Sequence, residues 1–180
     1  MDEALRLTLR IFDHEPSGPH PGQLWRGGAT DLATRASTDT PPRWLTIADH
    51  PPGSPPPAPE RAPLRQWSLE QINPGTLASP DTAGGVILVS MNVDPAHEDE
   101  FNDWYNMEHI PHFNRLPGVI AARRFRAIEG EPRYVALYHV ETTDIYATPA
   151  WMAANETPWI LRMRRFQRDR TYFMFRRRIA

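Results

Sequence analysis

The second half of the chain alternates apolar runs of strand length with amphipathic stretches. Residues 86–93 (VILVSMNV) form the first run, and residues 119–128 and 133–142 form two more, separated by the turn-like EGEP. The last run, TYFMFRRRI at 171–179, is apolar at both alternate sets of positions through Phe175, as expected of an interior strand. These patterns predict four strands, of which the middle two form a hairpin.

Helices are predicted in the two remaining intervals. Asp94 and Pro95 form a helix start, a capping residue followed by proline at the first helical position. At about 100° per residue, one side of this helix is largely apolar. It carries His97, Phe101, Trp104, Tyr105 and Glu108. Pro111 predicts that the helix ends or kinks at about residue 109 or 110.

A second helical region is expected from about residue 145 to 166, broken in two by Thr148-Pro149 and Thr157-Pro158. The resulting order of elements is β-α-β-β-α-β. This is the ferredoxin-like unit, so the predicted fold class is α+β.

The first part of the chain has a different composition. Of the 20 prolines, 14 lie in the first 80 residues, and residues 51–63 (PPGSPPPAPERAP) should be an extended, exposed connector. A weaker break, TLASPDTAGG, spans residues 76–85. We therefore expect two domains, a Pro-rich one at 1–80 and a complete ferredoxin-like one at 84–180.

The Pro-rich part nevertheless contains a degenerate copy of the same plan with few helices. PRWLTIAD (42–49) aligns with PRYVALYH (132–139), and RLTLRIFD (6–13) aligns with ILVSMNVD (87–94). LRQWSLEQI (64–72) takes the place of the last strand. Chance similarity of one short segment is the alternative. If the repeat is real, its two four-stranded sheets could close on each other within a single chain.

Composition excludes several classes of protein. The chain has 180 residues, a formal net charge of -2 and no cysteine, which excludes disulfide scaffolds, thiolate metal sites and cysteine nucleophiles. There is no apolar run of membrane-spanning length, and the amino end lacks the features of a signal peptide. We therefore expect a cytoplasmic protein with no membrane partner.

Arginine clusters near the carboxyl end resemble a nucleic-acid-binding patch. RRFQRDR at 164–170 and RRR at 176–178 carry them, but Asp169 interrupts the first and strand alternation spreads them over two faces. We interpret them as a solvated rim and expect no nucleic acid.

The densest cluster of polar and aromatic residues is FNDWYNMEHIPHFNRLPG at 101–118, followed by ARRF at 122–125. Over residues 85–180 this arrangement resembles the dimeric α/β-barrel family (EthD-like, ferredoxin-like). In that family a helix of the form F-x-x-W-Y-x-x-E-H-I-P precedes a P-G turn and a strand with paired arginines. The matching motif here starts at Phe101 and ends at Phe125.

The resemblance implies a barrel-type architecture, formed by a homodimer or by an intrachain pseudo-dimer. It also implies a pocket for a small hydrophobic or aromatic molecule. Members include polyketide cyclases, isomerases, dehydratases and decarboxylases that need no cofactor, and distant relatives that bind haem. The family histidine near the end of the first helix corresponds to His109. The first repeat has no equivalent of EHIP, so a second symmetric site is not expected.

His109 is also a candidate on chemical grounds, because the ordinary pKa of histidine lies near neutrality. Glu108 or Tyr105 could orient it, and Arg124 could stabilise a developing oxyanion. Alternatively, His109 only stabilises the helix end. Arg123 and Arg124 should point to opposite faces of their strand, and an ion pair with the acidic helix is an alternative for either.

Further pocket residues are predicted from the same cluster and from the hairpin strand. They are Trp104, His112, Tyr134 and Tyr138. These aromatics could instead be ordinary core. Glu108, His109 and His112 have poor spacing for a metal site, so no metal is expected. His109 or His139 as an axial haem ligand stays open.

The sequence thus predicts a cofactor-independent enzyme that transfers a proton on a small hydrophobic or polyketide-like molecule. A binding or structural module without turnover is the alternative, and haem binding is a third possibility. Whichever is correct, the expected partner is a small organic ligand.

Overall fold

All strands of the described chain belong to one closed antiparallel barrel. The computed structural model describes residues 5–17, 22–30 and 37–178, so the start of the first predicted domain lies outside the described residues. Around the barrel the strands follow the order β1-β3-β2-β8-β5-β7-β6-β4. Their bounds are β1 Arg6–Phe12, β2 Gln23–Thr30, β3 Ser37–His50, β4 Arg65–Asn73, β5 Gly85–Val93, β6 Val119–Glu129, β7 Tyr134–Val140 and β8 Gln167–Arg177. Closure therefore occurs within a single chain.

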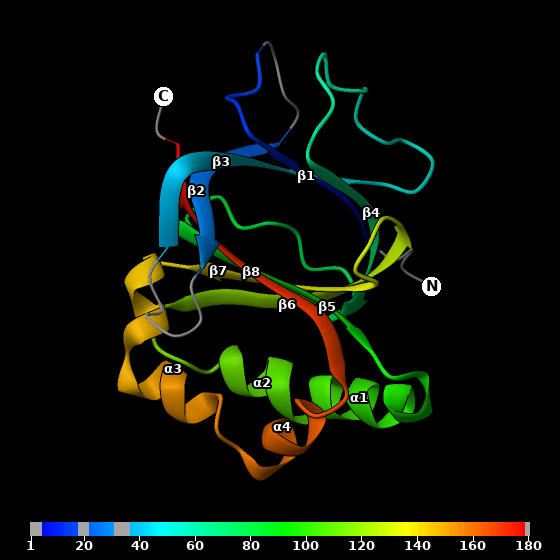
Figure 1. The fold of residues 1–180 in the computed structure, drawn as a ribbon, viewed down its shortest axis with the longest axis vertical. Helices are drawn as coiled ribbons and strands as arrows, with labels where there is room; N and C mark the ends of the chain where they lie inside the picture. Colours follow the sequence, from blue (N-terminus) through cyan, green and yellow to red (C-terminus); the bar gives the residue numbers. More distant parts are fainter. Residues whose placement is uncertain (1–4, 18–21, 31–36, 179–180) are drawn as a thin grey trace.

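The helices lie outside the barrel on one side, against the wall formed by β5 to β8 (Figure 1). Between β5 and β6 lie η1 Pro95–His97, α1 Glu98–Trp104, η2 Tyr105–His109 and α2 Ile110–Phe113. Between β7 and β8 lie η3 Thr143–Ala147, α3 Pro149–Ala154 and α4 Pro158–Met163. The second half thus has the predicted β-α-β-β-α-β order and a ferredoxin-like α+β fold.

Both halves of the barrel have the same strand order. Along the sheet the first half runs β4-β1-β3-β2 and the second runs β8-β5-β7-β6, which is the fourth, first, third and second strand in each. The halves join where β2 pairs with β8 and where β4 pairs with β6. This symmetry supports the repeat inferred from the aligned segments. The proposed boundary between two domains and the homodimer stay predictions.

The barrel interior is filled with apolar side chains from every strand. They include Leu9, Trp25, Leu45, Trp67 and Leu137, all fully buried. The segment between β4 and β5 crosses between the two walls (Figure 1), and Ala83 from it packs into this core. The inside of the barrel is therefore a packed core and does not form the ligand pocket.

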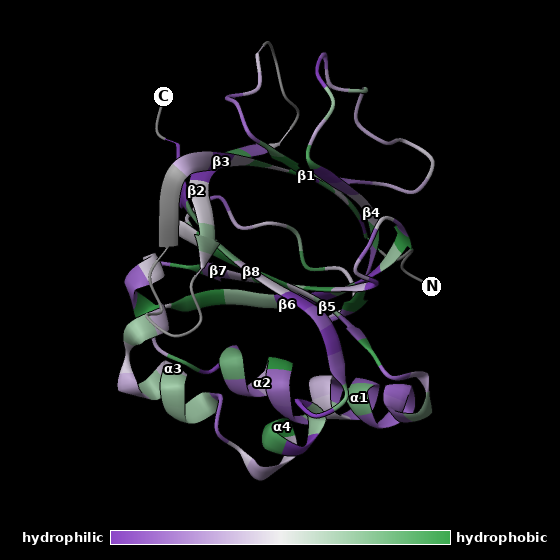
Figure 2. Cartoon of the chain, viewed as in Figure 1, coloured by the Kyte–Doolittle hydropathy of each residue, from purple (hydrophilic) through white to green (hydrophobic). Residues whose placement is uncertain are grey.

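A second core lies between the outer face of β5 to β8 and the helices. Phe101, Trp104, Ile110 and Phe113 from the first helical region pack here on outward-facing strand residues. The exposed side of α1 is hydrophilic (Figure 2), as predicted from its periodicity. The helix starts follow the predicted chemistry, because Asp94 accepts a hydrogen bond from the Ala96 amide at 3.0 Å.

The sequence predicted that the first helical region ends or kinks near Pro111, and the region does not end there. Helical backbone continues to Phe113, but residues 105–109 adopt a π-helical turn immediately before Ile110. Proline then occupies a first-turn position of α2, where its missing N–H costs little. The irregularity falls where the sequence predicted it, as a local widening of the helix.

The Pro-rich tract lies over the outer face of the first half, where the second half has helices. The loop carbonyl of Pro56 accepts a hydrogen bond from Arg10 of β1 at 3.4 Å. A cavity of about 230 Å³ lies between this loop and the strands β1 and β3. As predicted, the tract forms neither helix nor strand.

Candidate functional site

A cavity of about 250 Å³ lies between the helices and the outer face of β5, β7 and β8. Most of its wall is aromatic. The aromatic residues that line it include Trp104, Tyr105, Phe113, Tyr138, Trp151 and Tyr172. The wall combines these rings with polar and charged side chains, and such a concave site with polar groups at fixed positions can bind a small molecule.

His109 and Tyr138 form the polar centre of this cavity. The Nε2 atom of His109 lies 2.8 Å from the hydroxyl oxygen of Tyr138, and both side chains are buried. The imidazole packs against the rings of Trp104 and Phe113, with centroid separations of 4.6 and 4.5 Å. The sequence predicted both residues as site residues, and the structure brings them together.

Burial keeps both members of this pair uncharged at neutral pH. Burial is the main cause that lowers the pKa of His109 to about 3, and the positive charge of Arg124 is the second cause. Burial likewise raises the pKa of Tyr138 well above its usual range. The pair is therefore a hydrogen bond between a neutral imidazole and a neutral phenol, and a neutral imidazole has one nitrogen without a proton.

The π-helical turn places two site residues on one side of the first helical region. Tyr105 and His109 are its first and last residues, and their rings are 4.8 Å apart, edge to face. Both line the cavity. π-Helical turns are rare and often occur at functional sites, so this local geometry supports the choice of His109.

Arg124 lies behind the cavity wall. Its guanidinium carbon is 4.4, 4.9 and 4.7 Å from the ring centroids of Tyr105, Phe101 and Tyr134, and Nη2 donates to Asn102 at 2.7 Å. Burial lowers the pKa of Arg124 to about 10, so it stays cationic at neutral pH. It does not line the cavity, and its effect on a ligand would pass through Tyr105.

The other predicted site residues have different partners. Glu108 accepts a hydrogen bond from Thr157 at the start of α4 at 2.6 Å, so its carboxylate does not orient His109. Tyr134 donates to Glu98 at 2.6 Å, and His112 packs beside Phe113 without lining the cavity. Trp104 does line it, and its indole Nε1 is buried without a hydrogen-bond partner among the described residues.

The two adjacent arginines of β6 point to opposite faces, as strand alternation predicts. Arg123 lies in the barrel interior, where it donates to Ser79 at 2.6 Å and to the Leu77 carbonyl at 2.9 Å. His139 also points inward, packs edge to face on Trp25 and is fully buried. A ligand in the helix-side cavity cannot reach His139, so an axial role in haem binding there is excluded for it.

Two cavity residues, Arg164 and Arg170, were not predicted from the sequence. Both were expected in a solvated rim, yet each is half-buried and lines the cavity. A signal was present for Arg170: it shares strand alternation with Tyr172 and the buried Met174, so it belongs to the covered face. Among the described residues, no group of three or more His, Asp or Glu side chains could hold a metal ion.

Comparison with known proteins identifies relatives by fold. A family described as a domain of unknown function (DUF4286) matches residues 86–169, less than half of the chain. The search of curated proteins gave no match. No helix in the described ranges has the length and apolar character needed to cross a membrane.

Three solved structures resemble the whole chain at low identity. An uncharacterised ferredoxin-fold protein from Listeria monocytogenes, related to antibiotic biosynthesis monooxygenases, is 9% identical with a TM-score of 0.56, covering 99% of this chain and 97% of its own. A putative monooxygenase from Fusobacterium nucleatum is 10% identical with a TM-score of 0.57, covering 98% and 94%. An anthrone oxidase-like protein is 10% identical with a TM-score of 0.59, covering 99% and 93%.

These likenesses show the fold. They extend over both halves of the barrel, so a ferredoxin-like α+β architecture of this length recurs in other chains. They support a ferredoxin-like relationship in general and do not single out the EthD-like branch.

Proposed function

We propose that the protein binds a small aromatic molecule in the helix-side cavity and transfers a proton on it without a cofactor. The observation that carries this proposal is the His109–Tyr138 hydrogen bond of 2.8 Å inside an aromatic cavity. The structural relatives include antibiotic biosynthesis monooxygenase-like proteins and an anthrone oxidase-like protein. A phenolic or polyketide-like compound is therefore the first class to test.

The pair offers both halves of an acid–base reaction. In the tautomer whose Nε2–H donates to the Tyr138 oxygen, Nδ1 of neutral His109 accepts a proton from an acidic C–H or phenolic O–H of the ligand, and the Tyr138 hydroxyl donates a hydrogen bond to the oxygen on which negative charge develops. The protonated His109 then returns the proton to another atom of the same molecule. Isomerisation, cyclisation and dehydration all use this sequence of steps.

Arg124 acts on the ligand indirectly, through Tyr105. Its guanidinium lies against the ring of Tyr105, and Tyr105 lines the cavity beside the pair. A cation behind Tyr105 strengthens the phenol as a hydrogen-bond donor to an oxyanion. Arg124 is thus a positioning residue, and Tyr105 is the group that would touch the ligand.

The first experiment identifies a ligand and then compares two histidines. Tryptophan fluorescence reports binding of anthrone, naphthols and related phenols, because Trp104 and Trp151 line the cavity. For a compound that the protein converts to a product, His109→Gln should lower kcat by about 10² to 10⁴-fold. His112→Gln, on the same helical segment but outside the cavity, is the matched control. Full activity of His109→Gln would contradict the proposal.

A binding module without turnover is the second candidate. It is favoured by the low pKa of His109, about 3, which makes the imidazole a weak base in the empty cavity. In that case the fluorescence titration finds ligands that leave the protein chemically unchanged. Tyr138→Phe should then weaken ligand affinity while no reaction is detected in any variant.

A further inference from the structure

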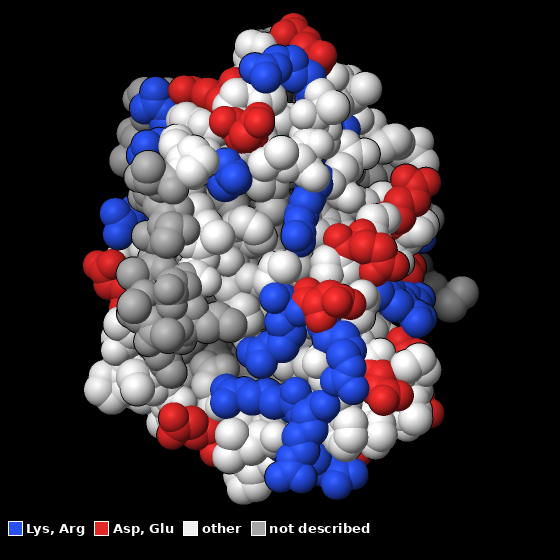
Figure 3. All heavy atoms as spheres, in the orientation of Figure 1, with Lys and Arg blue, Asp and Glu red and all other residues white. Residues whose placement is uncertain are grey.

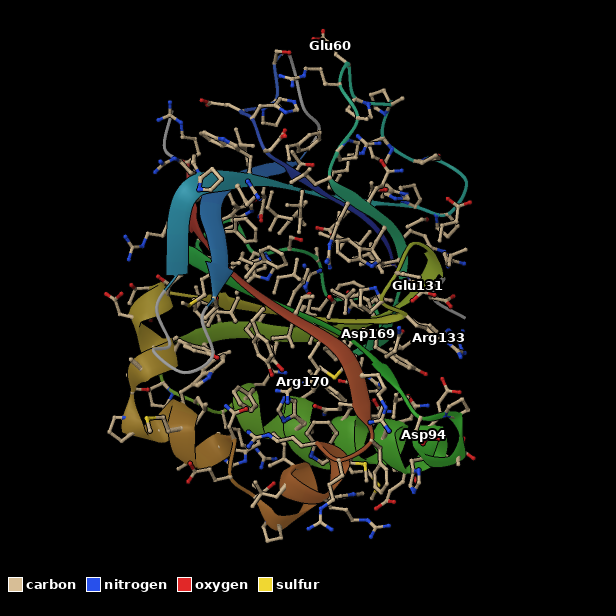
Figure 4. The ribbon with its side chains drawn as sticks, viewed as in Figure 1. Glu60, Asp94, Glu131, Arg133, Asp169 and Arg170 are labelled. Atoms are coloured by element: carbon tan, nitrogen blue, oxygen red, sulfur yellow. The ribbon has the colours of Figure 1, made fainter. Side chains whose placement is uncertain are left out.

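We propose that the ligand of the helix-side cavity is an acid, whose carboxylate is bound by Arg164 and Arg170. This inference rests on the proposed function because it uses the same cavity. It concerns the ligand that binds there and does not depend on which reaction follows. Arg164 follows α4, and Arg170 lies on β8. Figure 4 shows Arg170 in the space between β8 and the helices.

Both arginines line the cavity, and each uses one side-chain N–H group in a hydrogen bond to the protein. Arg164 donates one hydrogen bond from Nη2 to the Asn155 carbonyl at 2.6 Å, and Arg170 donates from Nη2 to the Tyr172 hydroxyl. The Nε atoms of both are buried, and neither has a hydrogen-bond partner among the described residues. A guanidinium group has five N–H donors and forms strong paired hydrogen bonds to carboxylates, so both arginines keep further donors that a bound carboxylate could use.

Trp104 adds a third donor of the same kind. Its indole Nε1 is also buried without a partner in the described part of the chain, and Trp104 lines the same cavity. Indole N–H and guanidinium are donors only, so none of the three can satisfy another. A ligand oxygen with several lone pairs would satisfy them, and a carboxylate has two such oxygens.

The charged side chains that line the cavity are positive, which also favours an anionic ligand. No Asp or Glu is present among the described residues that line it. The nearby arginines outside the cavity have acidic partners, since Arg162 pairs with Glu100 at 2.6 Å and Arg168 approaches Asp94 at 4.0 Å. Neither Arg164 nor Arg170 has such a pair in the described structure, and arginines gather on this face over α4 and β8 (Figure 3).

Both cations line the same cavity as the His109–Tyr138 pair. The charge of Arg164 acts on His109 and that of Arg170 acts on Tyr105, so a carboxylate between them would lie beside the reactive groups. A negative charge there would also favour protonated His109 and make it a better base. Given a cavity of about 250 Å³, we expect a one- or two-ring aromatic acid.

The test compares an acid with its neutral isostere. Calorimetric titrations with 2-naphthoate and 2-naphthamide should give binding of the acid and about tenfold or more weaker binding of the amide. Arg164→Gln and Arg170→Gln should each weaken naphthoate binding by about tenfold or more and leave amide binding unchanged. Arg162→Gln and Arg168→Gln are the matched controls and should change neither. Melting temperature without ligand confirms that each variant is folded.

The outcomes separate this inference from the proposed function. If the amide binds as tightly as the acid, and Arg164→Gln and Arg170→Gln bind the acid normally, the acid site is wrong and the aromatic cavity stands. If folded wild-type protein binds neither compound, both proposals are overturned. If the control variants lose as much affinity as the cavity variants, the effect is one of overall charge and the assigned site is wrong.

Discussion

Arg123 and Asp49 form an ion pair across the barrel interior, with Nη1 of Arg123 lying 3.2 Å from Oδ1 of Asp49. Arg123 belongs to β6 of the second half and Asp49 to β3 of the first. Ser79, which also accepts from Arg123, donates its backbone N–H to Asp49 at 2.8 Å. One buried cation therefore holds together the two halves and the segment that connects them.

Replacing Asp49 should destabilise the protein more than replacing an exposed acid. Asp49→Asn leaves the fully buried Arg123 without its counter-charge, so we expect the free energy of unfolding to fall by about 2 kcal/mol or more. Asp144→Asn is the control, because Asp144 and its partner Arg176 are both exposed, and it should cost about 1 kcal/mol or less. Urea denaturation measures both. Equal losses would contradict a structural role for the buried pair.

Stability should fall as the pH is lowered below about 6.5. Burial lowers the pKa of His109 to about 3 and that of His139 well below its usual range. From about pH 6.5 down toward pH 3 the unfolded chain binds more protons than the folded one at these positions, so acid favours unfolding. Each histidine contributes up to about 1.4 kcal/mol per pH unit.

A single substitution isolates the contribution of His109. His109→Gln removes one titrating group, so the fall in unfolding free energy between pH 7 and pH 5 should become shallower than in wild-type protein. Urea titrations at both pH values measure it. Identical pH dependence in the two proteins would show that His109 is not held uncharged by burial.

The hydroxyl of Thr157 should stabilise the packing of α4 against the first helical region. It accepts from the Ile160 amide at 3.3 Å and donates to Glu108 at 2.6 Å. Thr157→Ala loses both the cap and the partner of Glu108, so we expect a loss of about 1 to 2 kcal/mol. Thr157→Ser keeps the hydroxyl and should remain within about 0.5 kcal/mol of wild type. Similar losses in both variants, measured by thermal unfolding, would assign the effect to the methyl group.

Gly27 should be essential where β2 meets β8. A Cβ at this position would lie 1.9 Å from the Met174 carbonyl oxygen and 2.7 Å from the Phe175 Cα, both backbone atoms. Gly27→Ala must separate the strands, and we expect a loss of at least about 2 kcal/mol. Gly53→Ala is the comparison, because its Cβ meets no atom within 4 Å and only its φ of +77° opposes the change, at about 1 to 2 kcal/mol. A larger loss of unfolding free energy for Gly53→Ala than for Gly27→Ala would contradict the inference that the close approach of β2 and β8 requires glycine at position 27.

Hydrophobic periodicity predicted the elements of the second half because their apolar runs and helix starts are local signals. β5, β6 and β7 lie within one residue of the predicted ranges at most ends, and α3 and α4 begin at the predicted prolines. β2 was missed. Its Gly27-Gly28 pair is typical of a turn, and only the backbone of β8 against Gly27 shows why glycine is required in this strand.

The candidate site was predictable only in part, for the same reason. Helical spacing already placed Trp104 and Tyr105 on one side, whereas His109 was predicted from the family resemblance and from the chemistry of histidine. Arg164 and Arg170 come from different elements, and only the folded chain shows that both line the cavity. Glu108 shared the predicted helix side with Tyr105, but the π-helical turn and Thr157 direct its carboxylate elsewhere.

The pairing of β2 with β8 has a consequence for synthesis of the chain on the ribosome. β2 ends at Thr30, whereas its neighbour β8 begins at Gln167, so this edge of the first half has no partner until more than 130 further residues have been synthesised. Contacts so distant in sequence form slowly, and an open strand edge attracts other nascent chains in the meantime. The order of the strands thus makes synthesis of β8 the event that allows the barrel to close.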